Sequence, residues 1–152
     1  MGEVAVSGGV RELLSLPTSG YHWSLLVFDD TSPSSGPRFV HHDSIQGAPN
    51  FPVAERLVDA LSPLLVDAPG SRVPLVPGPT PSQTNDYDCG VYVMAIARAV
   101  CSWWIGRGEG GISNWFDAVR AEVDAARVKA MRPELLELIN HLIEEKAKAR
   151  AE

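Results

Sequence analysis

The core of this protein is predicted from residues 83–104, which read QTNDYDCGVYVMAIARAVCSWW. Residues 90–104 are almost wholly apolar, and Arg98 is the only charged residue among them. An apolar stretch of this length predicts a helix that is buried on nearly all sides. Cys89 opens this helix, directly after a polar approach that starts at Gln83.

A strand pair and a covering helix are predicted upstream of the core helix. Residues 23–28 read as a mostly buried strand, and residues 38–43 can pair back on it as an antiparallel hairpin. A helix is expected to begin after Pro52 and to cover the sheet, because apolar residues there recur at three- and four-residue steps. These residues are Val53, Leu57, Val58, Leu61, Leu64 and Leu65. A short strand at residues 72–76 and an extended Pro-rich segment at residues 77–81 then lead to the core helix.

The two ends of the chain carry different signals. Residues 1–20 hold one short apolar patch interrupted by Gly and Pro, so no element is predicted there. Residues 112–150 hold two amphipathic helical stretches, and residues 144–152 form a mixed-charge tail that is expected to fray. The apolar faces of the two stretches consist of Trp115, Phe116, Val119 and Val123, and of Leu135, Leu138, Ile139 and Leu142.

Composition narrows the class of protein. The chain has 152 residues, 45% of them hydrophobic and 21% charged, which is typical of one globular domain. A net charge of -6 disfavours binding to nucleic acid, because no broad cationic surface is available. Apolar stretches that are interrupted or shorter than roughly 20 residues predict no membrane span. We therefore expect a cytoplasmic and/or nuclear protein in which Cys89 and Cys101 are both reduced.

Cys89 is the candidate nucleophile. Unpaired backbone N–H groups at the start of a helix carry partial positive charge, which favours the thiolate form of a cysteine placed there. The alternative is a buried structural cysteine, which is the more common fate of an isolated cysteine. The position at a helix start, after a turn, favours the nucleophile.

Three other side chains could complete a thiol-catalytic site. His22 starts the first strand of the hairpin and Asp43 ends the second, so antiparallel pairing brings them together at one edge of the sheet. Gln83 approaches the core helix, where its amide N–H could stabilise an oxyanion. Taken singly, each has an ordinary interpretation as a partly buried histidine, a turn residue or a solvated loop side chain. His41 and His42 are expected to point to opposite faces, one of them to solvent, and no metal role is assigned to them.

The strings GYHWSLLVF (residues 20–28), FVHHDS (residues 39–44) and QTNDYDCGVYV (residues 83–93) resemble the Ulp/sentrin-specific protease family of cysteine peptidases. The resemblance implies an α+β, papain-like fold of the Ulp/adenain type, with a small antiparallel-containing sheet packed by helices. It implies one peptidase domain over residues 1–152. Within it, residues 1–20 are a poorly defined start, residues 21–101 carry the motifs, and residues 112–150 form the C-terminal helices.

The resemblance also implies a role for each site residue. His22 is implied as the general base, Asp43 as the residue that orients it, Cys89 as the nucleophile and Gln83 as the oxyanion donor. Trp23 is implied to lie over the thin diglycine tail of a ubiquitin-like modifier, and a flat indole leaves a slot for residues without side chains. No metal or cofactor is implied. The partners implied are a ubiquitin-like modifier, either the neddylation modifier or SUMO, and its conjugates.

Within the family, the strings after His22 and around Cys89 look closest to the deneddylase branch. A SUMO-specific protease, a catalytically weak modifier-binding module and an acyltransferase of the same Cys-His clan remain alternatives. Upstream of Tyr21 the resemblance stops, because family domains carry a longer segment there, with helices, a strand that extends the sheet and a second Trp. We therefore expect an N-terminally truncated domain, a compact variant, or a site completed from elsewhere.

Overall fold

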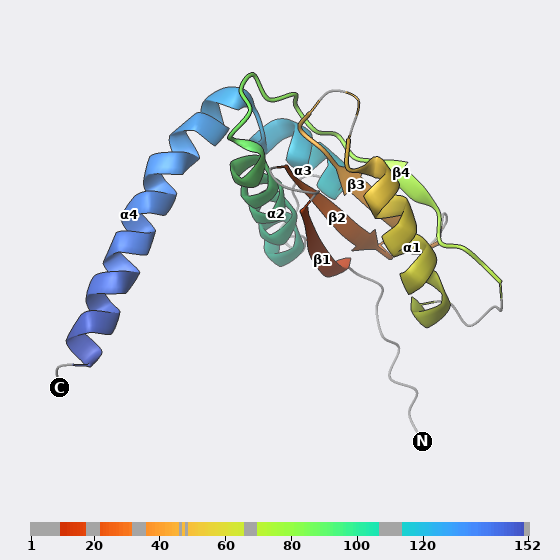
Figure 1. Cartoon of the computed structure of the whole chain (residues 1–152), viewed down its shortest axis with the longest axis horizontal. Helices are drawn as coiled ribbons and strands as arrows, with labels where there is room; N and C mark the ends of the chain where they lie inside the picture. The colour runs from red at the N-terminus through yellow and green to blue at the C-terminus, as the bar shows by residue number, and fades with distance from the viewer. Residues whose placement is uncertain are drawn as a thin grey trace.

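The computed structural model describes residues 10–17, 22–31, 36–45, 47, 49–65, 70–106 and 114–150. In chain order its elements are β1 (Val10–Pro17), β2 (Trp23–Asp29), β3 (Arg38–His42), α1 (Phe51–Leu65), β4 (Leu75–Pro77), α2 (Cys89–Gly106), α3 (Trp115–Glu122) and α4 (Ala125–Ala149). Figure 1 shows the sheet at the centre, with α1 and α2 on opposite sides of it and α4 extending away from the body. This arrangement confirms the predicted α+β fold class, with helices packed on a small sheet.

The described strands form one mixed sheet in the order β1-β2-β3-β4. β2 pairs antiparallel with β3, and Leu25 lies opposite His42 at the end of the ladder nearest the start of β2. The predicted hairpin is therefore confirmed. β4 joins β3 in parallel, which is possible because α1 carries the chain back along the sheet between them.

Alternation along β2 builds two separate cores. Leu25 and Val27 face α2 and α3, whereas Leu26 and Phe28 face α1. This period of two is what places successive side chains on opposite faces of a strand. Because both faces are covered, β2 is buried along its whole length except at Trp23, its first residue.

α2 is the core helix, although it is not buried on every side. Its buried side chains pack with those of β2, α3 and α4 in one cluster, while Met94, Cys101 and Ile105 are exposed. The expectation of burial on nearly all sides is wrong, because the sheet, α3 and α4 leave one strip of α2 uncovered. By length and composition alone α2 could cross a membrane, but its buried strip forms the larger core of this protein.

The structure also differs from the predictions elsewhere in the chain. β1 pairs antiparallel with β2, although no element was predicted in residues 1–20. Leu64 of α1 is 78% exposed, because it lies six residues after the buried Val58 and so falls on the far side of the helix. α4 continues as a helix to Ala149, so the tail that was expected to fray is helical over most of its length.

Candidate active site

The hairpin brings His22 and Asp43 together, as the sequence indicated. His22 directly precedes β2, and Asp43 directly follows β3. The Nε2 atom of His22 lies 2.6 Å from Oδ1 of Asp43. Both side chains are nearly removed from solvent, so this charge-assisted hydrogen bond is poorly screened by water.

Two main-chain N–H groups also donate hydrogen bonds to the Asp43 carboxylate. The N–H of Ile45 donates to Oδ1 at 2.9 Å, and the N–H of Asn50 donates to Oδ2 at 3.3 Å. A carboxylate that accepts from two backbone donors and an imidazole has little rotational freedom. The orientation of the His22 ring is therefore fixed through Asp43.

Gln83 is tied to the residue after Asp43. Its backbone N–H donates to the carbonyl of Ser44 at 2.8 Å, and its Oε1 accepts from the Ser44 hydroxyl at 2.6 Å. Its Nε2 donates to the carbonyl of Asn85 at 2.5 Å. An amide nitrogen carries two hydrogens, so this bond occupies one of them and leaves a second N–H for an oxyanion.

The turn before α2 places Cys89. Oδ1 of Asn85 accepts from the backbone N–H groups of Tyr87 and Asp88, and Nδ2 of Asn85 donates to the Asp88 carboxylate at 2.7 Å. The Asp88 carbonyl then accepts from Val91 and Tyr92, which starts the helix. Cys89 is buried in the first turn of α2.

The Asp88 side chain is an acceptor in this turn. The hydrogen bond from Asn85 lowers the pKa of its carboxyl group, partial desolvation opposes this, and the Arg132 guanidinium lowers the pKa further. A carboxyl group held in this way remains ionised at neutral pH. It shapes the turn in front of Cys89 and is not suited to act as a general acid.

Trp23 connects the start of β2 with the start of α2. Trp23 is 44% exposed. A Cβ atom added to Gly90 would lie 3.9 Å from Cδ1 of Trp23, so the indole lies beside the first turn of α2. The residue after His22 is thus next to the residue after Cys89, which puts the strand end and the helix start at the same place on the molecule.

His41 and His42 are both buried, so the expectation that one of them faces solvent is wrong. Nε2 of His41 lies 2.9 Å from Oγ of Ser24, and Nδ1 of His42 lies 3.0 Å from Oγ1 of Thr80. Burial lowers the pKa of His41 and lowers the pKa of His42 to about 3. The helices on both faces of the sheet explain why neither side chain reaches water.

Three further polar residues belong to this region, although none of them was predicted as a site residue: Ser24, Ser44 and Asn50. Ser24 and Asn50 are completely buried, and Ser44 is 3% exposed. Asn50 directly precedes α1, where an Asn is read as a helix cap. One feature of the sequence could have indicated Asn50. It lies seven residues after Asp43, in the segment that runs from the sheet edge to α1.

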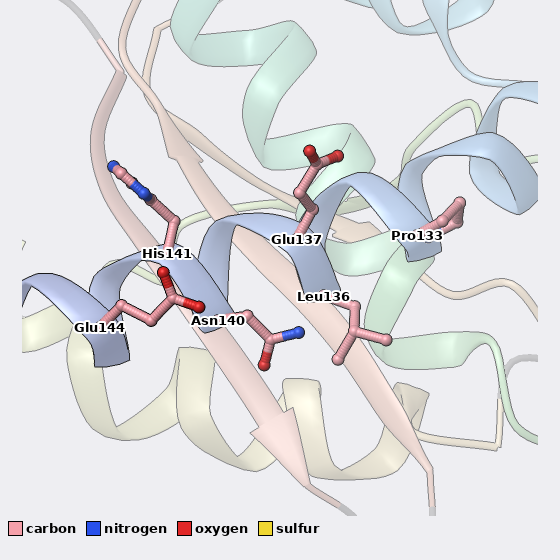
Figure 2. A pocket seen from close by; sticks show the side chains of 6 residues that line it. All are labelled: Pro133, Leu136, Glu137, Asn140, His141 and Glu144. Carbon is pink, nitrogen blue, oxygen red and sulfur yellow. The ribbon is translucent and has the colours of Figure 1, made fainter.

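Two hollows on the surface lie outside the predicted site residues. Figure 2 shows one along α4, lined by Pro133, Leu136, Glu137, Asn140, His141 and Glu144. All of these come from a single helix, so the hollow is a shallow surface feature. The other borders the turn before Cys89 and is lined by Thr84, Asn85, Tyr87, Asp88, Tyr92, Ala125, Lys129 and Arg132.

Known proteins with similar sequences include a NEDD8-specific protease and a sentrin-specific protease. NEDD8-specific protease 1 of Arabidopsis thaliana is 36% identical over 149 residues, a match that covers 89% of this chain and 61% of that protein. Sentrin-specific protease 8 of Homo sapiens is 35% identical over 82 residues, covering 54% of this chain and 36% of that protein. The chain therefore spans less than two thirds of the length of these relatives.

Solved structures show weaker similarity. A de-sumoylating protease aligns with a TM-score of 0.45 at 19% identity, over 88% of this chain and 60% of that chain. The Xanthomonas campestris effector XopD, solved bound to ubiquitin, aligns with a TM-score of 0.45 at 21% identity, over 72% of this chain and 59% of that chain.

The family profile of the Ulp1 protease C-terminal catalytic domain matches residues 14–102, which is more than half of the chain and includes His22, Asp43, Gln83 and Cys89. The chain therefore belongs to the Ulp1 protease family.

Proposed function

We propose that this protein is a cysteine isopeptidase that cleaves after the C-terminal Gly-Gly of a ubiquitin-like modifier, with NEDD8 as the preferred modifier. The observation that carries the proposal is the 2.6 Å contact between His22 and Asp43 at the sheet end that lies beside the first turn of α2. A histidine fixed by a carboxylate, next to a helix that begins with cysteine, is the arrangement that thiol catalysis requires.

The proposed reaction has two stages. In the first, His22 accepts the thiol proton, and the Cys89 sulfur attacks the carbonyl carbon of the last glycine of the modifier. The backbone N–H of Cys89 and the second Nε2 hydrogen of Gln83 stabilise the oxyanion. The C–N bond then breaks, the protonated His22 gives its proton to the leaving lysine amine, and a thioester remains on Cys89.

The second stage releases the modifier. His22 takes a proton from water, and the resulting hydroxide attacks the thioester carbonyl. The C–S bond breaks, and His22 returns its proton to the leaving Cys89 sulfur. The carboxylic acid formed on the modifier loses its proton to water, and the modifier departs as a free carboxylate. Asp43 supports both stages because its bond to Nε2 of His22 stabilises the imidazolium that forms in each. In this scheme the proton moves through Nδ1 of His22.

The exposed indole of Trp23 provides the proposed contact with the modifier tail. It lies beside the first turn of α2, so a peptide that crosses it delivers its last carbonyl to Cys89. A tail of two glycines fits under a flat ring because it has no side chains. The preference for NEDD8 is supported by 36% identity to a NEDD8-specific protease over most of this chain.

The test is covalent capture with three probes. NEDD8, SUMO and ubiquitin, each carrying a C-terminal electrophile, are incubated with the wild-type protein, and the adducts are mapped by mass spectrometry. We expect one adduct, with the NEDD8 probe, at Cys89. Cys89→Ala abolishes it, whereas the matched control Cys101→Ala retains it, because Cys101 is exposed and lies far along α2 from its start.

Two results would change the proposal. Capture of SUMO in place of NEDD8 would contradict the modifier preference and keep the isopeptidase. A folded wild-type protein that captures none of the three probes would contradict the isopeptidase itself.

A further inference from the structure

Asn50 is a buried polar residue that joins several parts of the site, and the proposed mechanism does not use it. It lies directly before α1, and its carbonyl accepts from the N–H groups of Val53 and Ala54, both at 3.0 Å. These bonds belong to the first turn of the helix, so the backbone of Asn50 is fixed by α1. The side chain is completely buried, and its amide is directed to the strands.

Asn50 contacts both members of the His22–Asp43 pair. Its backbone N–H donates to Oδ2 of Asp43 at 3.3 Å, on the carboxylate oxygen that His22 does not use. Its side-chain Nδ2 reaches the main-chain carbonyl of His22 at 3.5 Å. A carbonyl oxygen can only accept a hydrogen bond, so the atom facing it is the amide nitrogen.

A second layer holds the Asn50 amide. Nδ2 of Asn50 donates to Oγ of Ser24 at 3.0 Å, and the same oxygen lies 2.9 Å from Nε2 of His41. Ser24 and His41 belong to β2 and β3, and both are buried. The ring of His41 also packs edge-on against Phe51, with 5.7 Å between ring centroids. One amide therefore connects β2, β3 and the start of α1 behind the catalytic pair.

We infer that Asn50 is a positioning residue that keeps the His22 imidazole and the Asp43 carboxylate aligned. The inference rests on the proposed function and adds a residue to the same site. The loop after β3 is connected to β2 through the bond between His22 and Asp43. Asn50 fixes that loop to β2 from behind, so the imidazole does not have to maintain the geometry on its own.

The test uses two readouts on Asn50→Ala. The first is kcat/KM for hydrolysis of NEDD8 carrying a C-terminal 7-amido-4-methylcoumarin. The second is the pH midpoint of Cys89 alkylation by iodoacetamide in a Cys101→Ser background, which needs no modifier. We expect kcat to fall by about 30-fold with KM nearly unchanged, because small displacements of catalytic groups cost about 100-fold in rate. We expect the alkylation midpoint to rise by about one pH unit, because a misplaced imidazole stabilises the thiolate less.

Two variants accompany it. Asn140→Ala is the matched control on the exposed face of α4, and we expect it to leave both readouts unchanged. In Asn50→Ser the new residue is also favoured at helix starts, but its side chain cannot reach Ser24 and the His22 carbonyl together. This variant therefore tests the inference if Asn50→Ala does not fold. We expect Asn50→Ser to lower kcat by about tenfold and to raise the midpoint in the same direction.

A folded Asn50 variant that keeps kcat within twofold of the wild type, or keeps the wild-type alkylation midpoint, would overturn the inference. Failure of the proposed function gives a different result. In that case wild-type Cys89 would itself alkylate with the pH profile of an ordinary thiol, and both the function and the inference would be withdrawn.

Discussion

Two histidines of the hairpin show how surroundings decide the chemistry of a residue. His22 is hydrogen-bonded to the Asp43 carboxylate at the edge of the sheet. His42 packs against Trp115, with 5.6 Å between ring centroids, and burial lowers its pKa to about 3. A Cβ atom on Gly78 would overlap the His42 ring, which explains the glycine there. His42 therefore stays neutral at physiological pH and serves packing, whereas proton transfer is proposed for His22.

The buried His42 predicts how stability depends on pH. Its pKa is lowered by burial and then by His41, so the unfolded state takes up this proton below pH 6.5 while the folded state does so only near pH 3. The contribution of neutral His42 to the free energy of unfolding is fully present above pH 6.5. It is lost as pH falls toward 3, at up to about 1.4 kcal/mol per pH unit. Urea unfolding at pH 6.5, 5.5 and 4.5 should therefore show a shallower decline for His42→Gln than for the wild type.

The control for this measurement is His141→Gln, since His141 is exposed on α4. It should follow the wild-type decline. An identical decline in wild type and His42→Gln would show that His42 does not contribute in this way.

Arg132 links α4 to the turn that precedes Cys89. Its Nε and an Nη atom donate to Oδ1 of Asp88 at 3.0 and 2.5 Å, and an Nη atom donates to the carbonyl of Tyr87 at 3.1 Å. The guanidinium carbon also lies 5.4 Å from the centroid of the Tyr87 ring. α4 thus fixes the two residues that come directly before Cys89.

Loss of this link should affect activity more than stability. Arg132 is half exposed, so Arg132→Ala should lower the free energy of unfolding by less than about 1 kcal/mol. It should lower kcat/KM on the NEDD8 substrate by about tenfold, because the turn before Cys89 loses a fixed support. Arg98→Ala is the matched control. Arg98 of α2 pairs with Glu134 of α4, the helix that carries Arg132, but this pair lies away from the turn before Cys89. Equal activity of the two variants would contradict the role of Arg132.

The elements that the sequence predicted well are those with local patterns. β2 and α2 have continuous apolar runs, and α1 has helical spacing, so each was found near its observed bounds. β1 was missed because glycines and a proline surround a weak apolar patch, and its strand form depends on pairing with β2. The exposure of apolar residues on α2 and α4 was also not predicted. Whether such a residue is buried depends on how far the neighbouring element extends along the helix, and the local pattern does not show this.

The same distinction applies to the site. His22 and Asp43 lie close together because they stand at the start of one strand and the end of the next in an antiparallel hairpin. The hairpin could be predicted from the sequence alone. The role of Asn50 follows from hydrogen bonds across three elements, none of which has a local signature. The roles assigned to Cys89, Gln83 and Trp23 stay predictions.

At the scale of the whole molecule, α4 is divided into a packed start and an exposed remainder. Val128 and Met131 are buried in the main core, and Leu135 packs against it. Beyond this point the helix extends away from the body, as Figure 1 shows. Large apolar residues exposed on this remainder are Leu136, Leu138, Ile139, Leu142 and Ile143. The core that holds the site is therefore complete without the second half of α4.

This division predicts unequal effects of substitutions along one helix. The double variant Leu138→Gln, Leu142→Gln should change the free energy of unfolding by less than about 0.5 kcal/mol, because neither side chain is buried in the body. Val128→Ala should cost about 1–2 kcal/mol, because it leaves a cavity against a completely packed neighbourhood. Urea denaturation measures both, and a large loss in the double variant would mean that the second half of α4 belongs to the folded core.

The central claim is that His22 and Asp43 work as one unit on the Cys89 thiol. The most direct measurement is kcat/KM for the NEDD8 coumarin substrate in the wild type, His22→Ala, Asp43→Ala and the double variant, each checked for folding by circular dichroism. We predict a fall of about 10³-fold for His22→Ala and about 10²-fold for Asp43→Ala, and a double variant no slower than His22→Ala alone. Losses that multiply in the double variant, or a His22→Ala protein that stays within tenfold of the wild type, would contradict the account.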